Sequence, residues 1–276
     1  MSKRYGMLWE GMPMTNNNLT NAINNCVQRG DKAFVPYIMA GDDGLQTLKR
    51  NILFLQEIGV TAIELGIPFS DPVADGPVIQ EAGERALAHG VTLRSVMKEL
   101  EVIRPEITVP IVIMTYLNPI ISYGIAEFIK DCGTSGVSGL IVPDLPLEES
   151  DLLLNGLEGS GIALVPLVSL TSPPERIQKI TAAGEGFIYA VTVNGITGVR
   201  DGFDDDLAAH LKQLKEISPV PVLAGFGIST PEQVESIGAL ADGVIVGSAI
   251  VTALHKEDWD TIEKLVNASK STSLYS

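Results

Sequence analysis

The chain has 276 residues, of which 45% are hydrophobic and 19% charged, and its formal net charge is −15. This length and apolar content fit one large α/β domain, and the acidic charge argues against a nucleic-acid surface or an anionic membrane as the partner. An anionic small substrate stays open, because backbone N–H groups at a helix N-terminus can bind phosphate without Lys or Arg.

Cysteine usage and hydropathy indicate the compartment. Cys26 and Cys132 lie far apart, with no C-x-x-C motif and no histidine neighbour. We interpret both as buried free thiols in a reducing compartment. No apolar run reaches the roughly 18 residues of a membrane helix. Lys3 and Arg4 are followed by no uninterrupted apolar stretch of the kind found in a signal peptide, so we expect a cytoplasmic protein.

Helix and strand patterns alternate along most of the chain. Residues 1–18 have no clear period and are expected to form a flexible leader, and residues 269–276 a polar tail. Between them, one helix precedes eight units that each consist of a strand and a helix. The predicted strands are Ala33–Met39, a short strand around Glu64, Ile111–Thr115, Leu140–Pro143, Ala163–Val168, Phe187–Val191, Pro221–Ala224 and Gly243–Val246. The predicted helices are Leu19–Gly30, Leu45–Ile58, Pro77–His89, Thr92–Ile103, Ile125–Cys132, Glu148–Leu157, Pro174–Ala183, Leu207–Ile217, Pro231–Leu240 and Ala249–Val266.

The strands predict the fold class. They are continuously apolar, which is typical of a parallel sheet covered on both faces. Eight right-handed strand–helix units close most simply into a single (β/α)8 TIM barrel, here residues 19–268, with an extra N-terminal helix. An open doubly wound sheet is the alternative. That fold normally carries Gly-x-Gly-x-x-Gly after its first strand, and Gly41-Asp42-Asp43-Gly44 does not match.

An acidic stretch follows the second strand. Glu64 lies inside a short apolar run that Gly66 and Pro68 end, and the loop beyond contains Asp71 and Asp75. A buried carboxylate costs several kcal/mol unless it is protonated, hydrogen-bonded or open to a cavity. A lone strand-end Glu usually faces solvent. The second carboxylate and the proline-stiffened loop favour an acid/base site.

Glycine-rich segments follow the last three predicted strands. They are Gly195-Ile196-Thr197-Gly198, Gly225-Phe226-Gly227-Ile228-Ser229 and Gly247-Ser248. Glycines let backbone N–H groups approach an anion, and barrels commonly bind phosphate after strands seven and eight. We therefore predict a phosphate site there. Tyr116, Tyr189 and Phe226 lie at strand ends, where core packing and a ligand wall stay equally open as interpretations.

No metal site is predicted. His89 lies at a helix end, His210 and His255 fall within helical patterns, and no His/Cys/Asp/Glu cluster has metal-ligand spacing. The run Asp204-Asp205-Asp206 precedes a helix and is interpreted first as a helix cap.

Five motifs follow one another along the chain: the stretch from Glu64 to Pro77, Pro143-Asp144-Leu145-Pro146, Gly195-Ile196-Thr197-Gly198, Gly225-Phe226-Gly227-Ile228-Ser229 and Gly247-Ser248-Ala249-Ile250-Val251. In this order, and over about residues 33–254, they resemble the tryptophan synthase alpha subunit family. The resemblance implies a lyase that cleaves indole-3-glycerol phosphate into indole and glyceraldehyde 3-phosphate. It also implies no cofactor in this chain and a partner beta chain that carries pyridoxal phosphate, in an alpha2-beta2 heterotetramer that makes L-tryptophan.

The resemblance also assigns roles to residues. It implies that Glu64 is the acid/base glutamate and Asp75 the catalytic aspartate. The remaining assignments are phosphate contacts at Gly198, Gly227, Gly247 and Ser248; an indole pocket of Tyr37, Tyr116, Tyr189 and Phe226; the mobile-loop residue Thr197; and the partner-facing residues Asp71 and Pro72.

Two other functions stay open. The chain could chiefly bind and activate a partner with negligible turnover of its own, although intact Glu64 and Asp75 favour catalysis. It could also be another phosphate-binding barrel enzyme, such as a sugar-phosphate isomerase or an aldolase. A class I aldolase needs a strand-end Lys for its Schiff base, and no predicted strand contains one.

Overall fold

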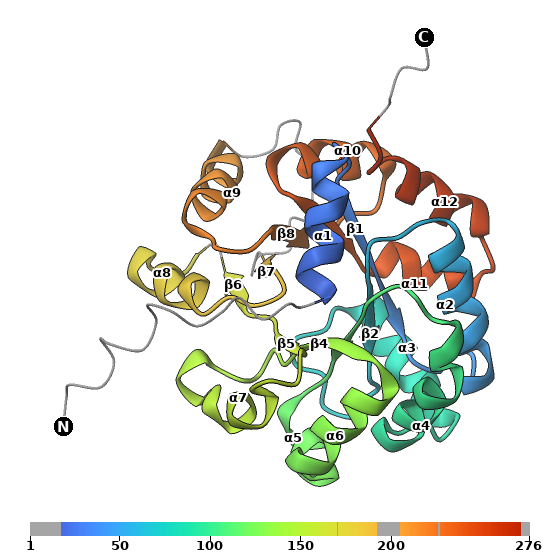
Figure 1. Cartoon of the computed structure of the whole chain (residues 1–276). Helices are drawn as coiled ribbons and strands as arrows, with labels where there is room; N and C mark the ends of the chain where they lie inside the picture. The colour runs from blue at the N-terminus through green and yellow to red at the C-terminus, as the bar shows by residue number, and fades with distance from the viewer. Residues whose placement is uncertain (1–17, 170, 192–204, 226, 272–276) are drawn as a thin grey trace, which may run out of the picture.

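The computed structural model describes residues 18–169, 171–191, 205–225 and 227–271. Its strands form one parallel sheet in the order β5-β4-β3-β2-β1-β9-β8-β7-β6, and the helices form a ring around that sheet (Figure 1). The strands are β1 (Ala33–Met39), β2 (Ile63–Gly66), β3 (Ile111–Met114), β4 (Val137–Ile141), β5 (Ala163–Leu164), β6 (Leu167–Ser169), β7 (Ile188–Val191), β8 (Val222–Gly225) and β9 (Gly243–Val246).

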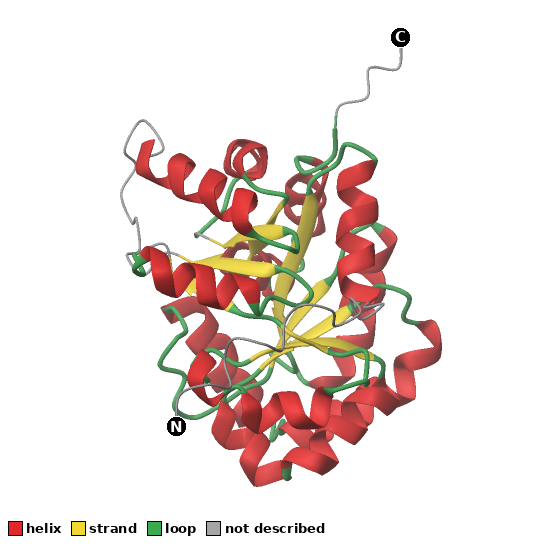
Figure 2. Ribbon diagram, turned by 60° about the vertical axis from the view of Figure 1, so that its left-hand side comes forward, coloured by secondary structure: helices red, strands yellow, loops and turns green. Residues whose placement is uncertain are grey.

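The predicted barrel with an extra N-terminal helix is confirmed. Figure 2 shows the strands enclosed by helices. The helices are α1 (Asn18–Gln28), α2 (Leu48–Glu57), α3 (Pro77–Ala88), α4 (Leu93–Ile103), α5 (Leu117–Tyr123), α6 (Ile125–Ser135), α7 (Asp151–Leu157), α8 (Pro174–Ala182), α9 (Asp205–Ile217), α10 (Pro231–Leu240), α11 (Ser248–His255) and α12 (Trp259–Asn267). Among the described residues, none of these helices has the length and apolar character that crossing a bilayer requires.

One predicted strand is divided in two. Val165 and Pro166 separate β5 from β6, and Pro166 has no N–H to donate to a sheet ladder. The segment still joins the two edges of the sheet, because the Val165 N–H donates to Leu140 and the Pro166 carbonyl accepts from Tyr189. β5 pairs with β4 and β6 pairs with β7, so this single stretch of chain closes the barrel.

Other elements also differ from the sequence prediction. The pattern predicted as one helix over Ala249–Val266 is two helices, because Glu257 between them has a φ of 53° and Asp258 caps α12. β4 begins at Val137, three residues before the predicted start, and ends before Pro143. Helix α5 was not predicted; its seven residues are too few to show a clear period.

The barrel interior is closed at one end by α1. We call the amino-terminal ends of the strands the base and the carboxyl-terminal ends the mouth. Leu19 and Ile23 of α1 are fully buried, and they pack with inward-facing strand residues such as Val35 and Phe187. The Thr20 hydroxyl donates to the Gly186 carbonyl at 3.1 Å. Helix α1 therefore covers the base of the barrel.

Candidate active site

Glu64 is buried at the mouth without a polar partner. It lies on β2, in register with Tyr37 of β1 and Val112 of β3, and is 1% exposed. Neither of its carboxylate oxygens has a hydrogen-bond partner among the described residues. Burial, and secondarily the nearby Asp75 charge, raises the pKa of Glu64 to about 8. The side chain therefore carries a proton at neutral pH and can donate it to a ligand in the barrel.

Asp75 shares this space with Glu64. It lies in the loop between β2 and α3 and is half-buried. Burial raises the pKa of the Asp75 carboxyl, and hydrogen bonding from the Tyr116 side chain opposes that rise. Both carboxyl groups line a cavity of about 180 Å³ at the mouth. The structure thus brings together the two predicted catalytic residues, with different environments for their protons.

Two tyrosines form part of the same cavity wall. Tyr37 and Tyr189 line it, and burial is the main cause of the raised pKa of each phenol. Each ring occupies space that a glycine leaves free: a Cβ on Gly66 would overlap the Tyr37 ring, and one on Gly225 would come within 2.8 Å of the Tyr189 hydroxyl. Sequence reasoning missed this role of the two glycines, although a glycine inside a strand pattern signals a close approach.

The glycine segments after β8 and β9 present backbone donors to the same cavity, which Gly227, Gly247 and Ser248 line. Gly227 has a φ of 62°, which favours glycine. Helix α11 begins at Ser248 with Gly247 as its N-cap and no side-chain hydrogen bond to the cap. Its first N–H groups are therefore available to an anion.

The N-terminus of helix α10, which follows β8, has its backbone N–H groups occupied by side chains of the same segment. The Gln233 side-chain oxygen accepts from the backbone N–H groups of Ser229 and Thr230, and Thr230 caps the Gln233 N–H. Pro231 at the first helical position has no N–H. The two helix starts therefore differ, and only α11 offers free donors to an anion.

The predicted partner-facing loop lies at the outer edge of the mouth. Asp71 is exposed and accepts a hydrogen bond from the Ser70 hydroxyl at 2.6 Å, and Pro72 is half-buried. Val73, next in the loop, is 85% exposed.

Tyr116 lies beneath this loop, with 4% of its surface exposed. It is not among the described residues that line the cavity around Glu64, so its predicted place in the indole pocket stays a prediction. Three other predicted site residues, Thr197, Gly198 and Phe226, lie outside the described residues.

A larger cavity of about 910 Å³ adjoins the site and shares Asp75, Tyr189 and Gly227 with it. Most residues of its remaining wall are apolar, with Leu154 and Leu167 among them. This volume and lining suit a ligand that combines an apolar ring with a few polar groups.

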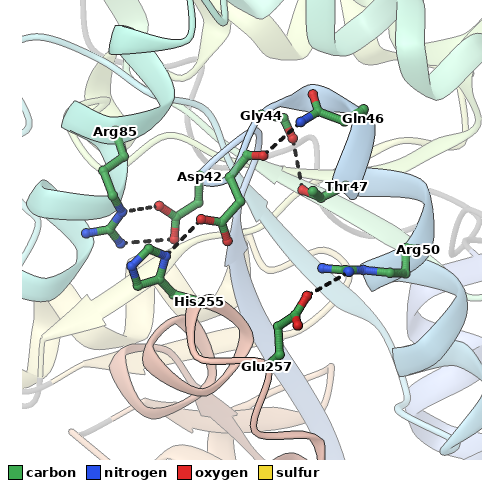
Figure 3. Close-up of polar contacts among 9 residues, drawn as sticks. Asp42, Gly44, Gln46, Thr47, Arg50, Arg85, His255 and Glu257 are labelled. Carbon is green, nitrogen blue, oxygen red and sulfur yellow. Dashed lines mark hydrogen bonds and ion pairs between the residues drawn. The ribbon is translucent and has the colours of Figure 1, made fainter.

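A second acidic cluster lies outside the cavity (Figure 3). The Arg85 guanidinium donates two hydrogen bonds to Asp42, at 2.5 and 3.1 Å, and the His255 ring lies 2.9 Å from Asp43. Residues far apart in sequence meet here, so their spacing could not reveal the cluster. Arg85 belongs to α3 and His255 to α11, so these two contacts hold the loop after β1 against both helices.

The fold and this site define the class of protein. A parallel eight-unit barrel, with buried acid groups and free helix-end donors at the carboxyl ends of its strands, is a barrel enzyme with its active site at the mouth.

Comparisons with known proteins identify the family. The model of the tryptophan synthase alpha chain family matches residues 23–274. The tryptophan synthase alpha chain of Bacillus mycoides (strain KBAB4) is 52% identical over 245 residues, which cover 89% of this chain and 95% of that one. The chain belongs to the tryptophan synthase alpha chain family, which confirms the resemblance in its motifs.

Solved structures agree with this assignment. A tryptophan synthase structure from Mycobacterium tuberculosis matches with a TM-score of 0.84 and 33% identity, over 92% of this chain and 98% of that one. The alpha subunit from Legionella pneumophila str. Paris matches with a TM-score of 0.82 and 33% identity, over 91% and 98% of the two chains.

Proposed function

We infer that this chain is the lyase of its family and cleaves indole-3-glycerol phosphate to indole and glyceraldehyde 3-phosphate. The observation that carries the inference is Glu64, a buried acid with a pKa of about 8, which lines an open cavity with Asp75 and whose oxygens have no partner among the described residues. A non-catalytic binding protein has no use for such a group, because it lowers the stability of the fold.

Glu64 supplies the proton that starts the reaction. The carbon–carbon bond between the ring and the glycerol chain breaks only after indole C3 is protonated, which turns the ring into an indolenine cation. A carboxylic acid that is still protonated near pH 7 can donate that proton. The resulting carboxylate then accepts the proton of the glycerol hydroxyl next to the breaking bond, and the electrons return to the ring as indole leaves.

Asp75 stabilises the positive charge that develops on the ring. Its carboxylate accepts the indole N–H, and this hydrogen bond strengthens as the ring becomes cationic in the transition state. The different environments of the two carboxyl groups support this division of roles. Glu64 is buried with no partner among the described residues, whereas Asp75 is half-buried and follows Ala74, whose N–H bonds the Tyr116 hydroxyl.

The phosphate of the substrate binds at the start of α11. The uncapped N-terminus of this helix and the backbone of Gly227 and Gly247 support this role, and the Ser248 hydroxyl adds one donor. Gly198 is assigned as a further phosphate contact, and Thr197 to the mobile loop that closes over the substrate. Tyr37, Tyr189, Tyr116 and Phe226 are assigned to the pocket around the indole ring.

The family implies a beta-chain partner, and we propose that it docks on the loop containing Asp71 and Pro72. The 85% exposure of Val73 in this loop supports that docking surface. Indole is neutral and diffuses away unless a partner receives it, so the alpha chain would work in an alpha2-beta2 heterotetramer in the cytoplasm. The beta chain would carry the pyridoxal phosphate, and this chain would need no cofactor.

The test is indole release from indole-3-glycerol phosphate by the pure chain, with and without a beta chain. We expect turnover that the beta chain increases, and a loss of at least about 10³-fold in Glu64→Gln and Asp75→Asn, because each removes a group that acts in the transition state. Both variants should still bind the beta chain. Unchanged turnover in either variant would contradict its role, and absence of turnover in the wild-type complex would favour a purely activating function.

A further inference from the structure

Tyr116 touches both ends of the loop that follows β2. It lies at the N-cap of α5 and its ring packs against Phe69, with ring centroids 5.2 Å apart. At the other end of the loop, the Tyr116 hydroxyl oxygen accepts the Ala74 N–H at 2.9 Å. Because the side chain is 4% exposed, water does not compete strongly for these contacts.

The hydroxyl proton of Tyr116 remains available for the neighbouring carboxylate. A phenol has one proton and two lone pairs, so accepting the Ala74 N–H leaves its proton free to donate. Asp75 follows Ala74 directly, and hydrogen bonding from Tyr116 lowers the pKa of Asp75 against the effect of burial. One side chain thereby holds the backbone before Asp75 and favours the charged form of its carboxylate.

Asp144 in the loop after β4 holds Tyr116 in place. Its carboxylate accepts the N–H of Leu117, the residue after Tyr116, at 2.9 Å. This bond fixes the first turn of α5, where an unsatisfied backbone donor would otherwise remain. The loops after β2, β3 and β4 are therefore connected by side-chain-to-backbone hydrogen bonds through Tyr116.

We propose that Tyr116 is a positioning residue, which holds the backbone next to Asp75 and so couples the conformation of the loop after β2 to the reaction. The proposal rests on the catalytic role of Asp75 proposed above. Among the described residues, the titratable groups that interact with Asp75 are Tyr37 from β1, Glu64 from β2, Tyr116 after β3 and Tyr189 from β7. The described residues that line the smaller cavity include no Lys or Arg, and Arg176, which lines the larger cavity, is paired with Glu148. Among the described residues, the Tyr116 side chain opposes the effect of burial on the pKa of Asp75.

The test compares Tyr116→Phe with Tyr123→Phe. Each change removes one buried tyrosine hydroxyl that makes a hydrogen bond. Tyr123 is the control, because it is 8% exposed and donates to Asp131 at 2.5 Å, away from the cavity. For Tyr116→Phe we expect turnover to fall about 10- to 100-fold, with KM changed less than about threefold. The acidic limb of its kcat/KM profile should move to higher pH, because Asp75 loses a donor to its charged form. Tyr123→Phe should change neither.

The outcomes separate the two proposals. If Tyr116→Phe matches Tyr123→Phe in turnover and pH profile while Asp75→Asn is inactive, the positioning role is wrong and the role of Asp75 stands. If Asp75→Asn keeps full turnover, both are wrong. Asp144→Ala provides a second variant on an exposed residue, in case Tyr116→Phe fails to fold. It should move the acidic limb in the same direction by a smaller amount, and an unmoved limb would contradict the proposal.

Discussion

The two ends of the barrel differ in whether their polar side chains have hydrogen-bond partners. At the base, the Asp242 carboxylate accepts the Val222 N–H at 2.9 Å and pairs with the Lys215 ammonium at 2.9 Å. At the mouth, both oxygens of Glu64 and the hydroxyl of Thr115 are buried with no partner among the described residues. These polar groups at the base are therefore paired, whereas those at the mouth have no partner among the described residues.

This difference separates stability from function within one sheet. A satisfied buried polar group contributes to stability, whereas an unsatisfied one costs about 1–3 kcal/mol and persists where a ligand completes it. Helix α1 reinforces the base, because Leu19 fills the space beside Gly139 and Gly186 at the starts of two strands. Changes at the base should therefore affect stability alone, and changes at the mouth should affect activity first.

The largest expected effect comes from breaking the base. Leu19→Ala removes a fully buried side chain that α1 places against the strand starts, which should lower the free energy of unfolding by about 2–4 kcal/mol. Urea unfolding measures this loss. Turnover per folded molecule at 25 °C should stay within about twofold, since the mouth is unchanged. A variant with normal stability and lost turnover would contradict the separation of the two ends.

At the mouth, Glu64→Gln should have the opposite effect on stability to Leu19→Ala at the base: it should raise the free energy of unfolding. The folded-state pKa of Glu64 is about 8 and its usual value is 4.5, so the unfolded chain ionises first. The wild type should therefore lose stability as pH rises from about 4.5 to 8, and the loss should level off above that range. Gln does not ionise, so the variant should gain about 1–3 kcal/mol relative to wild type at pH 8 and less at pH 5.

Glu101→Gln is the matched control for this measurement, because Glu101 is exposed on α4. It should change the free energy of unfolding by less than about 0.5 kcal/mol at both pH values. A Glu64→Gln gain that is the same at pH 5 and pH 8 would contradict the raised pKa.

Local sequence patterns predicted most of the barrel. Apolar runs indicate the strands and glycines and prolines indicate where elements end, and both signals depend only on residues close together in the sequence. The sequence also contained a sign of the break between β5 and β6, because Pro166 has no N–H to donate to the sheet. Glu64 and Asp75 were predicted from an acidic loop after a buried strand, and the structure brings them together.

Contacts between distant residues could not be predicted. The bond between Tyr116 and Ala74 and the fit of Tyr37 against Gly66 depend on which strands are neighbours and on their register. The pairing of Arg85 with Asp42 depends on how α3 packs beside the loop after β1. Periodicity reports which side of an element is buried, and says nothing of which side chain it meets.

The smallest expected effect is at the phosphate site, where backbone groups provide most of the binding. Ser248→Ala removes one exposed hydroxyl at the start of α11 and leaves the helix N–H groups in place. KM for indole-3-glycerol phosphate should rise about three- to tenfold with kcat unchanged, which corresponds to the loss of one hydrogen bond to a charged group. Ser229→Ala is the control, because that hydroxyl bonds Gln233 at the closed start of α10 and its loss should leave KM within about twofold. Equal changes of KM in the two variants would contradict phosphate binding at α11 in preference to α10. A KM that rises more than about 100-fold in Ser248→Ala would show that the side chain, and not the backbone, provides most of the binding.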